Sequence, residues 1–257
     1  MYILKSLIYI LLLLPIIGYS QTSGVIYYTS VMKMDRELPD HIPEDIRKTI
    51  PKERKVNKEL YFDKTASVFK NGEQVQTEDG EFDGEGRGRR FRRRMMEGGA
   101  DEQTYTDLSS KAAVKTRDIM GKTFLIEDEP TSYKWKMTGQ KKQIFDYLAM
   151  EATTSINDSV QVNAWFTPQI PVSIGPGDLG GLPGAILEAS YNDRASRTIT
   201  ATKIELKDLD KSEIKKPSKG KKVTQEEFNE IRKEKMKEMR GQRGGRGGFR
   251  GRRGGGL

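Results

Sequence analysis

The chain has 257 residues and a formal net charge of +8, and it contains a single histidine and no cysteine. The absence of cysteine excludes disulfides, a thiol nucleophile, Cys/His zinc sites and a lipidated N-terminal cysteine. The length favours one main domain, whose stability must come from apolar burial and backbone pairing.

The positive charge is concentrated in two short segments. Residues 84–94 contain six Arg and one Glu (net +5), and residues 240–257 contain six Arg and no acid (net +6). Because +8 − 11 = −3, the rest of the chain is mildly acidic. The basic character therefore belongs to two glycine-arginine segments and not to the body of the protein.

The first 20 residues have the pattern of a secretory signal peptide. A charge at Lys5 precedes an apolar run from Leu7 to Ile17, and small residues follow up to Ser20. A membrane anchor is the competing interpretation, but this run of eleven residues, interrupted by Pro15, is shorter than the roughly 20 residues that a spanning helix needs. We expect export and cleavage near Ser20.

The next 84 residues predict strands, one short helix and a loop. Residues 24–34 are rich in β-branched and aromatic side chains, and residues 60–70 predict two more strands joined near Asp63. Between them, Pro43 in a first turn and Ile46 and Ile50 on one face predict a helix over about 41–50. Residues 74–104 have no apolar periodicity and predict a disordered loop.

The remainder of the body predicts a continuing meander. Residues 133–137 alternate apolar and charged side chains, Thr138-Gly139 predicts a turn, and a longer strand follows through Met150. Further strands are expected at residues 160–166, 185–191 and 198–206. The fold class is therefore mainly β, as a single curved antiparallel sheet or a partly open barrel.

Beyond residue 210 the composition changes to Lys and Glu. Thr224 and Glu227 have the spacing of a capping box, which predicts a helix over about 225–240 that ends at Gly241. Its apolar face is thin, so we expect it to dock weakly or project. We thus expect a signal peptide at 1–20, a β domain at 21–210, and at 211–257 a helix followed by a disordered tail with RGG repeats.

No common catalytic or cofactor pattern is complete in this sequence. His41 lies in a Pro-flanked segment, which disfavours a Ser-His-Asp triad. The spacing GxGxxG occurs at 175–180, but Gly-Leu-Pro-Gly follows it instead of a helix that would hold a pyrophosphate. We expect no cofactor and no metal. The carboxylates available to a hydrolase are Glu151, Asp158, Asp178, Glu188 and Asp193, and their spacing singles out no pair.

The arginine segments are candidate anion-binding sites, through Arg87, Arg89, Arg90, Arg92, Arg93, Arg94, Arg243, Arg246, Arg250, Arg252 and Arg253. Three interpretations stay open. The segments bind an anionic membrane surface or acidic partner, they only solubilise the chain, or they bind nucleic acid with Phe91 and Phe249 as stacking surfaces. Export disfavours nucleic acid.

Residues 164–176 (AWFTPQIPVSIGP) and 180–188 (GGLPGAILE) resemble the signature of the GLPGLI family of exported Bacteroidetes-type proteins. The resemblance implies a β domain in the periplasm or associated with the outer membrane, often encoded near outer-membrane transport genes, without an established activity. Two positions depart from the family pattern. Ala185 replaces a leucine, and Leu148 lies near a position where relatives carry cysteine.

The same stretch supplies the candidate ligand-binding residues: Trp165, Phe166, Gly181, Leu182, Pro183 and Gly184. Its prolines have no backbone N–H to donate to a neighbouring strand, and its glycines permit positive φ angles. The segment therefore predicts a wide, rigid connection between two strands. Trp165 and Phe166 beside this loop either line a ligand groove or plug the end of a barrel, and the plug is favoured. Three functions follow as hypotheses: an envelope accessory or binding protein, which we prefer, a carboxylate-dependent hydrolase, or an anionic-polymer binder.

Overall fold

A computed structural model of the chain describes residues 22–33, 53–73, 102–156, 160–192 and 196–244, with backbone only from residue 239 on. The expected signal peptide, the helix predicted at 41–50, nearly all of the loop predicted at 74–104 and the arginine-rich tail from residue 245 lie outside the described residues. Asp158 and Asp193 lie outside them as well.

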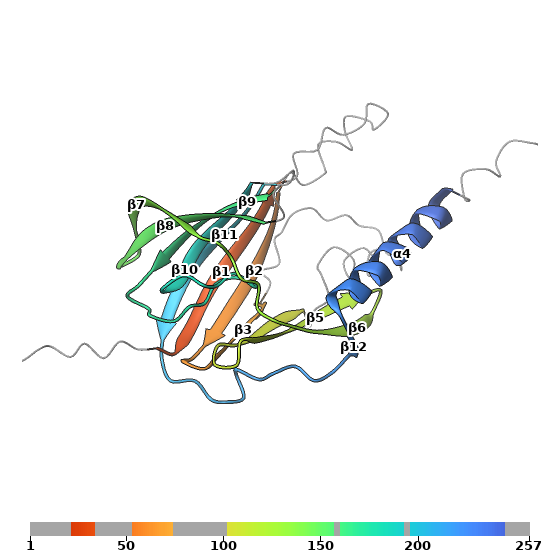
Figure 1. The fold of residues 1–257 in the computed structure, drawn as a ribbon, viewed down its shortest axis with the longest axis horizontal. Coiled ribbons are helices and arrows are strands. Elements are labelled where there is room, and N and C mark those ends of the chain that lie inside the picture. Colours follow the sequence, from red (N-terminus) through yellow and green to blue (C-terminus); the bar gives the residue numbers. More distant parts are fainter. Residues whose placement is uncertain (1–21, 34–52, 74–101, 157–159, 193–195, 245–257) are drawn as a thin grey trace, which may run out of the picture.

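Within the described residues, twelve strands form one sheet in the order β12-β6-β5-β4-β3-β2-β1-β11-β10-β9-β8-β7 (Figure 1). The strands are β1 Gly24–Lys33, β2 Glu53–Phe62, β3 Ala66–Asn71, β4 Gln103–Asp107, β5 Ala112–Ile119, β6 Lys122–Asp128, β7 Lys136–Ile144, β8 Tyr147–Ile156, β9 Val160–Thr167, β10 Ala185–Asn192, β11 Arg197–Leu206 and β12 Lys221–Val223. The helix described is α4, Gln225–Gly244.

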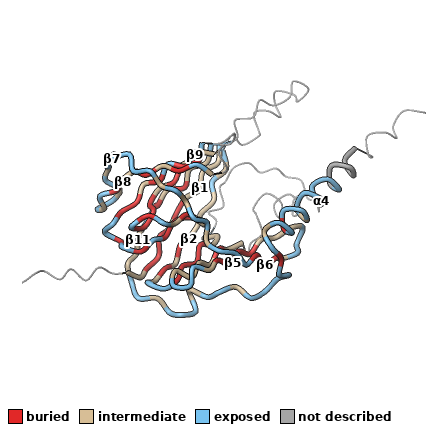
Figure 2. The backbone as a smooth tube through the Cα atoms, in the orientation of Figure 1, coloured by how far each residue is buried: buried red, intermediate tan, exposed pale blue. Residues whose placement is uncertain are grey.

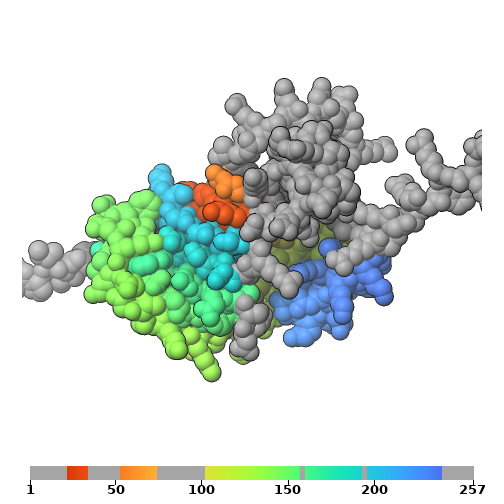
Figure 3. Space-filling model, turned by 90° about the horizontal axis from the view of Figure 1, so that it is seen from above, coloured from red at the N-terminus to blue at the C-terminus, as the bar shows by residue number. Residues whose placement is uncertain are grey.

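The sheet is open, with β7 at one edge and β12 at the other. Neighbouring strands pair antiparallel except β12, which pairs parallel with β6. The predicted mainly β class with a single curved sheet is confirmed, and the sheet does not close into a barrel. In the space-filling view the β7–β8 end and helix α4 lie at opposite ends of the molecule (Figure 3).

We call the face that carries the main core the inner face. Alternation along the strands sends Ile26, Leu60 and Phe166 to this face, where all three are buried. The buried backbone gathers along β1, β2 and β8–β11 (Figure 2). The neighbours of these residues in sequence point to the opposite, outer face. The main core therefore lies on one side of the sheet and needs a cover there, although the outer-facing Val25, Val68 and Leu125 are buried too.

Two irregular segments and the helix provide that cover. The GLPG loop, residues 168–184, joins β9 to β10 and adds Ile170, Ile174 and Leu182 to the core. The crossing segment, residues 129–135, runs from β6 to β7 and packs Tyr133 and Trp135 against the same core. At the other end of the sheet, Phe228 of α4 packs against Phe124 and Ile126, with the two phenyl rings edge to face at 5.8 Å.

The predicted turn at Thr138-Gly139 is wrong. Strand β7 continues through both residues, with Gly139 at φ +81° and a register shift against β8 between Met137 and Lys141. The chain reverses at Phe145, which has φ +53°. A bulge and a turn both use positive φ, so the glycine signal alone does not separate them. Tyr133 and Trp135 also precede the strand instead of belonging to it.

Other strand and helix boundaries differ from the predicted ones because the sequence pattern is weak there. Strand β2 begins at Glu53, before the predicted strand, in a charged run that is half-exposed. Strand β12 follows β11, which was expected to be the last. The predicted capping box is confirmed, since the Glu227 N–H donates to Thr224 Oγ1 at 3.1 Å and the Thr224 N–H to Glu227 Oε2 at 2.9 Å. The helix passes the predicted stop at Gly241 and ends at Gly244.

Substitution of Gly184 tests whether the GLPG loop depends on the close approach of its backbone to Thr167. A Cβ atom at this position would lie 2.1 Å from the backbone carbonyl oxygen of Thr167, a clash that no rotamer relieves. We expect Gly184→Ala to lower the free energy of unfolding by about 2–4 kcal/mol, as measured by urea denaturation.

Gly180→Ala is the matched control in the same loop, because its nearest neighbour would be Ser173 O at an ordinary 3.5 Å. This variant should unfold within about 0.5 kcal/mol of the native chain. Equal effects of the two substitutions would contradict the role given to Gly184.

Candidate functional site: an inner groove beside the GLPG loop

The GLPG loop follows the inner face as an extended segment without being a strand of the sheet. Its first half alternates, with Ile170, Val172 and Ile174 buried and Pro171 and Ser173 exposed. Two tight backbone bonds shape it, because the N–H of Val172 donates to Ile170 O at 2.8 Å and the N–H of Ile174 donates to Val172 O at 2.9 Å. The loop therefore satisfies much of its backbone locally while it buries every second side chain.

The start of β10 anchors this loop. The N–H groups of Ala185 and Ile186 donate to Ile170 O and Ile174 O at 3.1 and 2.9 Å. The register of β10 against β9 shifts just after Ile186, and the buried hydroxyl of Tyr28 donates to the carbonyl of Ile186 at 2.6 Å. Burial raises the pKa of Tyr28, which keeps its hydroxyl a donor. A single tyrosine thus satisfies the carbonyl beside the bulge.

The structure divides the sequence-predicted ligand residues between two faces. Phe166, Leu182 and Gly184 are buried in the inner core, whereas Gly181 and Pro183 are exposed on the loop. Trp165 points to the outer face, because it is adjacent to Phe166 in one strand. Phe166 is therefore a core residue, whereas Trp165 belongs to a different surface.

On the outer face Trp165 has charged neighbours. Lys142 Nζ lies 4.3 Å from the centre of its ring and 2.9 Å from Glu188 Oε2. Glu151 pairs with Trp165 across β8 and β9, and its Oε2 accepts a hydrogen bond from Thr138 Oγ1 at 2.8 Å. Two of the predicted carboxylates thus flank the tryptophan, each with a polar partner already in place.

A groove lies on the inner face where the covers end. It has a volume of about 440 Å³ and is bounded by the GLPG loop, the β5–β6 hairpin and helix α4. Its lining is Glu102, Lys115, Arg117, Asp118, Ile119, Ile126, Asp178, Gln225, Phe228, Asn229 and Arg232. Acidic, basic and apolar side chains thus meet in one concave space.

An ion pair links the two walls of this groove. Lys115 Nζ of β5 lies 3.1 Å from Asp178 Oδ2 of the GLPG loop. The lysine side chain is only 11% exposed and that of the aspartate 38%, so the carboxylate faces the solvent side. Thr131 Oγ1 of the crossing segment donates to the same oxygen at 3.3 Å. One carboxylate therefore joins β5, the crossing segment and the GLPG loop.

The crossing segment and the loop are held together further by a tryptophan. Trp135 Nε1 donates to Gly180 O at 2.8 Å, and the ring of Tyr133 lies 5.7 Å from that of Trp135. The loop end is closed by the N–H of Gly181, which donates to Ser173 Oγ at 2.8 Å. This arrangement positions Asp178 without a regular element.

The titration behaviour of these groups follows from burial and charge. Burial acts to raise the pKa of Asp178, but Lys115 and the hydrogen bonds to the carboxylate outweigh it and lower the pKa below its usual value. Burial raises the pKa of Tyr191 to about 12, although Arg197, whose guanidinium lies 3.9 Å from the ring centre, opposes the shift. Asp178 is therefore charged at neutral pH, whereas the nearby Tyr191 stays protonated.

Lys115 is the groove residue that sequence reasoning missed. It occupies a buried, inward position of strand β5, and a lysine at such a position is a recognisable signal for a buried partner. Asp178 belonged to the predicted carboxylates, but its partner is 63 residues away in sequence. Only pairing across the fold brings these two together.

The side chains of the eleven candidate anion-binding arginines lie outside what the structure describes. Arg243 belongs to α4, but its side chain is not described, and the other ten lie outside the described residues. Among the described residues no group of three or more acidic or histidine side chains is arranged to hold a metal ion. In the same part of the chain no helix combines the length and apolar character that crossing a membrane requires.

The family model described as "Protein of unknown function (Porph_ging)" matches residues 153–188. This segment contains the last four residues of β8, all of β9, the GLPG loop and the first half of β10. The matched residues are therefore those that build the loop side of the groove, including Asp178. No curated protein matches the chain.

Solved structures of PNGF-II share the fold of this chain. Two structures of PNGF-II are similar with a TM-score of 0.51 each, at 15% and 14% identity over 82% and 81% of this chain. The chain spans about a third of the length of PNGF-II, since the matches cover 33% and 32% of that protein. An uncharacterized conserved protein from Thermus thermophilus matches with 6% identity over 80% of this chain and 93% of its own, at a TM-score of 0.38.

The lowered pKa of Asp178 predicts how its contribution depends on pH. A carboxyl group whose pKa is depressed by folding stabilises the fold above its unfolded pKa of about 3.9, and this contribution disappears as the pH falls through the folded value. At pH 7 we expect Asp178→Asn to lower the free energy of unfolding by about 1–2 kcal/mol, a range that allows for solvent screening.

The difference between the native chain and Asp178→Asn should shrink as the pH falls below about 4. Urea unfolding across this range measures it. Glu230→Gln, at an exposed position of α4, is the control and should stay close to the native chain at pH 7. A difference for Asp178→Asn that does not change with pH would contradict the assignment.

Proposed function

We propose that this chain is an exported accessory or binding protein of the cell envelope, of the GLPGLI type, which holds part of a partner protein in its inner groove. The observation that carries the proposal is the Lys115–Asp178 ion pair at the junction of three segments, with its carboxylate exposed to the groove. Peptides offer charged and apolar groups at short intervals, as this lining requires.

The lining supports a peptide over a small apolar ligand. Lys115, Arg117 and Arg232 supply positive charge, while Glu102, Asp118 and Asp178 supply negative charge. Phe228 and Ile126 form an apolar patch beside them. Such a surface fits an extended segment with basic and acidic side chains, and envelope or outer-membrane transport proteins are the partners that the sequence resemblance implies.

The hydrolase hypothesis has less support in the arrangement of side chains. Glu188 is in an ion pair with Lys142, and Glu151 accepts hydrogen bonds from Thr138 and Asn163. The ring face of Trp165, against which a sugar would stack, is occupied by the Lys142 ammonium group. We therefore retain the binding function and assign the arginine segments an auxiliary role at an anionic surface.

A pull-down from envelope extract tests the groove. The bait is the mature chain, residues 21–257, and the critical variant is Lys115→Met combined with Asp178→Asn, which removes both charges and so leaves no unpaired buried ion. We expect the native chain to retain a defined partner that the double variant retains at least about tenfold less.

Two further baits distinguish the inner groove from the outer patch and from the arginine segments. Glu151→Gln with Glu188→Gln changes the outer patch and should retain the partner as the native chain does. A version that lacks residues 84–98 and 240–257 should retain it too, with less attachment to anionic vesicles. Equal capture by the groove variant and the native chain would contradict the groove as the binding site.

A further inference from the structure

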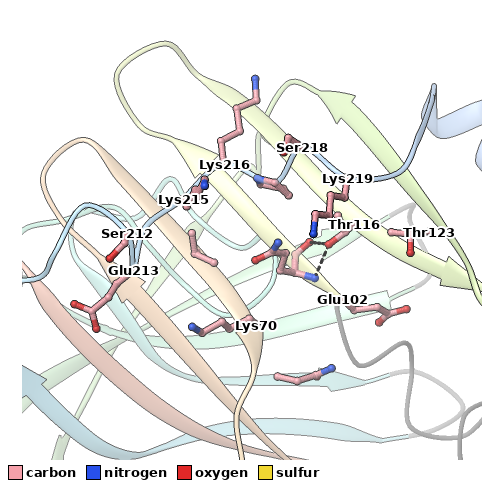
Figure 4. A pocket seen from close by; sticks show the side chains of 14 residues that line it. Lys70, Glu102, Thr116, Thr123, Ser212, Glu213, Lys215, Lys216, Ser218 and Lys219 are labelled. Atoms are coloured by element: carbon pink, nitrogen blue, oxygen red, sulfur yellow. Dashed lines mark hydrogen bonds between the residues drawn. The ribbon is translucent and has the colours of Figure 1, made fainter.

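The outer face of the sheet carries a second cavity, beneath an irregular segment that we call the strap, residues 207–220. The strap leaves β11, crosses β3–β6 and enters β12. Between it and the sheet lies a cavity of about 520 Å³ (Figure 4). The lining is Val68, Lys70, Asn71, Glu102, Gln103, Thr116, Thr123, Ser212, Glu213, Lys215, Lys216, Pro217, Ser218 and Lys219.

The strap covers buried apolar side chains of the outer face, such as Val68 and Leu125, but the cavity beneath it has a mainly polar lining. Apart from the alkyl parts of its polar residues, the cavity wall contains only Val68 and Pro217 as apolar groups. Four lysines and two glutamates give it a net charge of 4 − 2 = +2, and two threonines and two serines add hydroxyl groups. The strap thus shields part of the outer face with its own half-buried Leu209 and Ile214, and it also encloses polar, positively charged space.

Of the strap lysines, Lys207 pairs with Glu205, whereas the three that line the cavity form no such pair within the described residues. In the part of the chain that the structure describes, no carboxylate lies within ion-pair distance of Lys215, Lys216 or Lys219. Lys219 extends towards Thr116 on the sheet, whereas Lys216 points away from it (Figure 4). From the sheet side, Lys70 places its ammonium 4.0 Å from the ring centre of Tyr61. Unpaired cations in a concave site attract anions.

The strap is fixed at both ends, so the cavity does not depend on a ligand for its shape. At its start the N–H of Lys207 donates to Ser23 O at 3.2 Å. At its end Gly220 has φ +138°, and a Cβ there would lie 3.1 Å from Thr123 O. Strand β12 then pairs with β6. A 14-residue connection without regular structure that is held in this way is more often functional than accidental.

We propose that the strap cavity binds a phosphorylated saccharide. Lysine ammonium groups bind the phosphate, and the hydroxyl, amide and carboxylate groups of the wall bind sugar hydroxyls. The volume is within the range of small-ligand sites. No aromatic side chain of the described residues lines the cavity, so it offers no stacking surface for a nucleobase. The ligand is either a free sugar phosphate or the phosphorylated sugar headgroup of a glycolipid.

Calorimetric titration of residues 21–257 with glucose 6-phosphate tests the free form, with glucose and inorganic phosphate as comparators. We expect saturable binding of glucose 6-phosphate that is tighter than either comparator and weakens with added salt. Lys70→Met combined with Lys219→Met should weaken it by about tenfold or more. Lys211→Met is the matched control, because it removes a strap charge outside the cavity, and it should change binding by less than about twofold.

Vesicle sedimentation distinguishes the two sources. If phosphatidylcholine vesicles that contain lipid A retain the native chain while glucose 6-phosphate does not bind, and the double variant lowers retention more than Lys211→Met does, the ligand is the lipid headgroup. Absence of saturable binding to both probes overturns the proposal. Binding that Lys211→Met weakens as much as the double variant also overturns it, because the interaction would then be diffuse charge attraction. Thermal unfolding of each variant verifies that the fold is intact.

Discussion

The need to cover an apolar inner face without closing the sheet governs this structure. A barrel or a sandwich covers its inner strands with other strands, but here β7 and β12 remain open edges. Each buried large side chain such as Phe166 or Ile186 contributes about 1.5–3 kcal/mol only if something shields it from water. The GLPG loop, the crossing segment and α4 provide that shield, so they are structural elements in spite of their irregular or peripheral character.

The chemistry of the GLPG loop follows from this task. A cover must present apolar side chains to the sheet while leaving no backbone group unsatisfied. Prolines such as Pro171 and Pro183 lack an N–H to satisfy, short internal bonds serve Val172 and Ile174, and Gly184 permits the close approach to Thr167. The match of a family model to residues 153–188 indicates that this covering unit recurs in other chains.

The two cavities arise where covers meet or end. On the inner face the GLPG loop and α4 leave β5 between them, and Lys115 and Asp178 close part of the gap. On the outer face the strap is separated from β3–β6 by a cavity whose lining is mainly polar. The edge strand β7 is protected differently, by exposed lysines and a register shift that disfavour pairing with another chain. The resemblance to part of PNGF-II extends to the fold alone.

The sequence by itself determined the mainly β class, several strands to within a residue or two, and the capping box of α4, because these depend on local alternation and on side chains three residues apart. It also identified the GLPG segment as a rigid connection. Tertiary structure alone decided that Trp165 and Leu182 lie on opposite faces, that Gly139 is in a bulge, and that Lys115 meets Asp178. These features depend on register and on contacts between residues far apart in the chain, and such contacts leave no local pattern in the sequence.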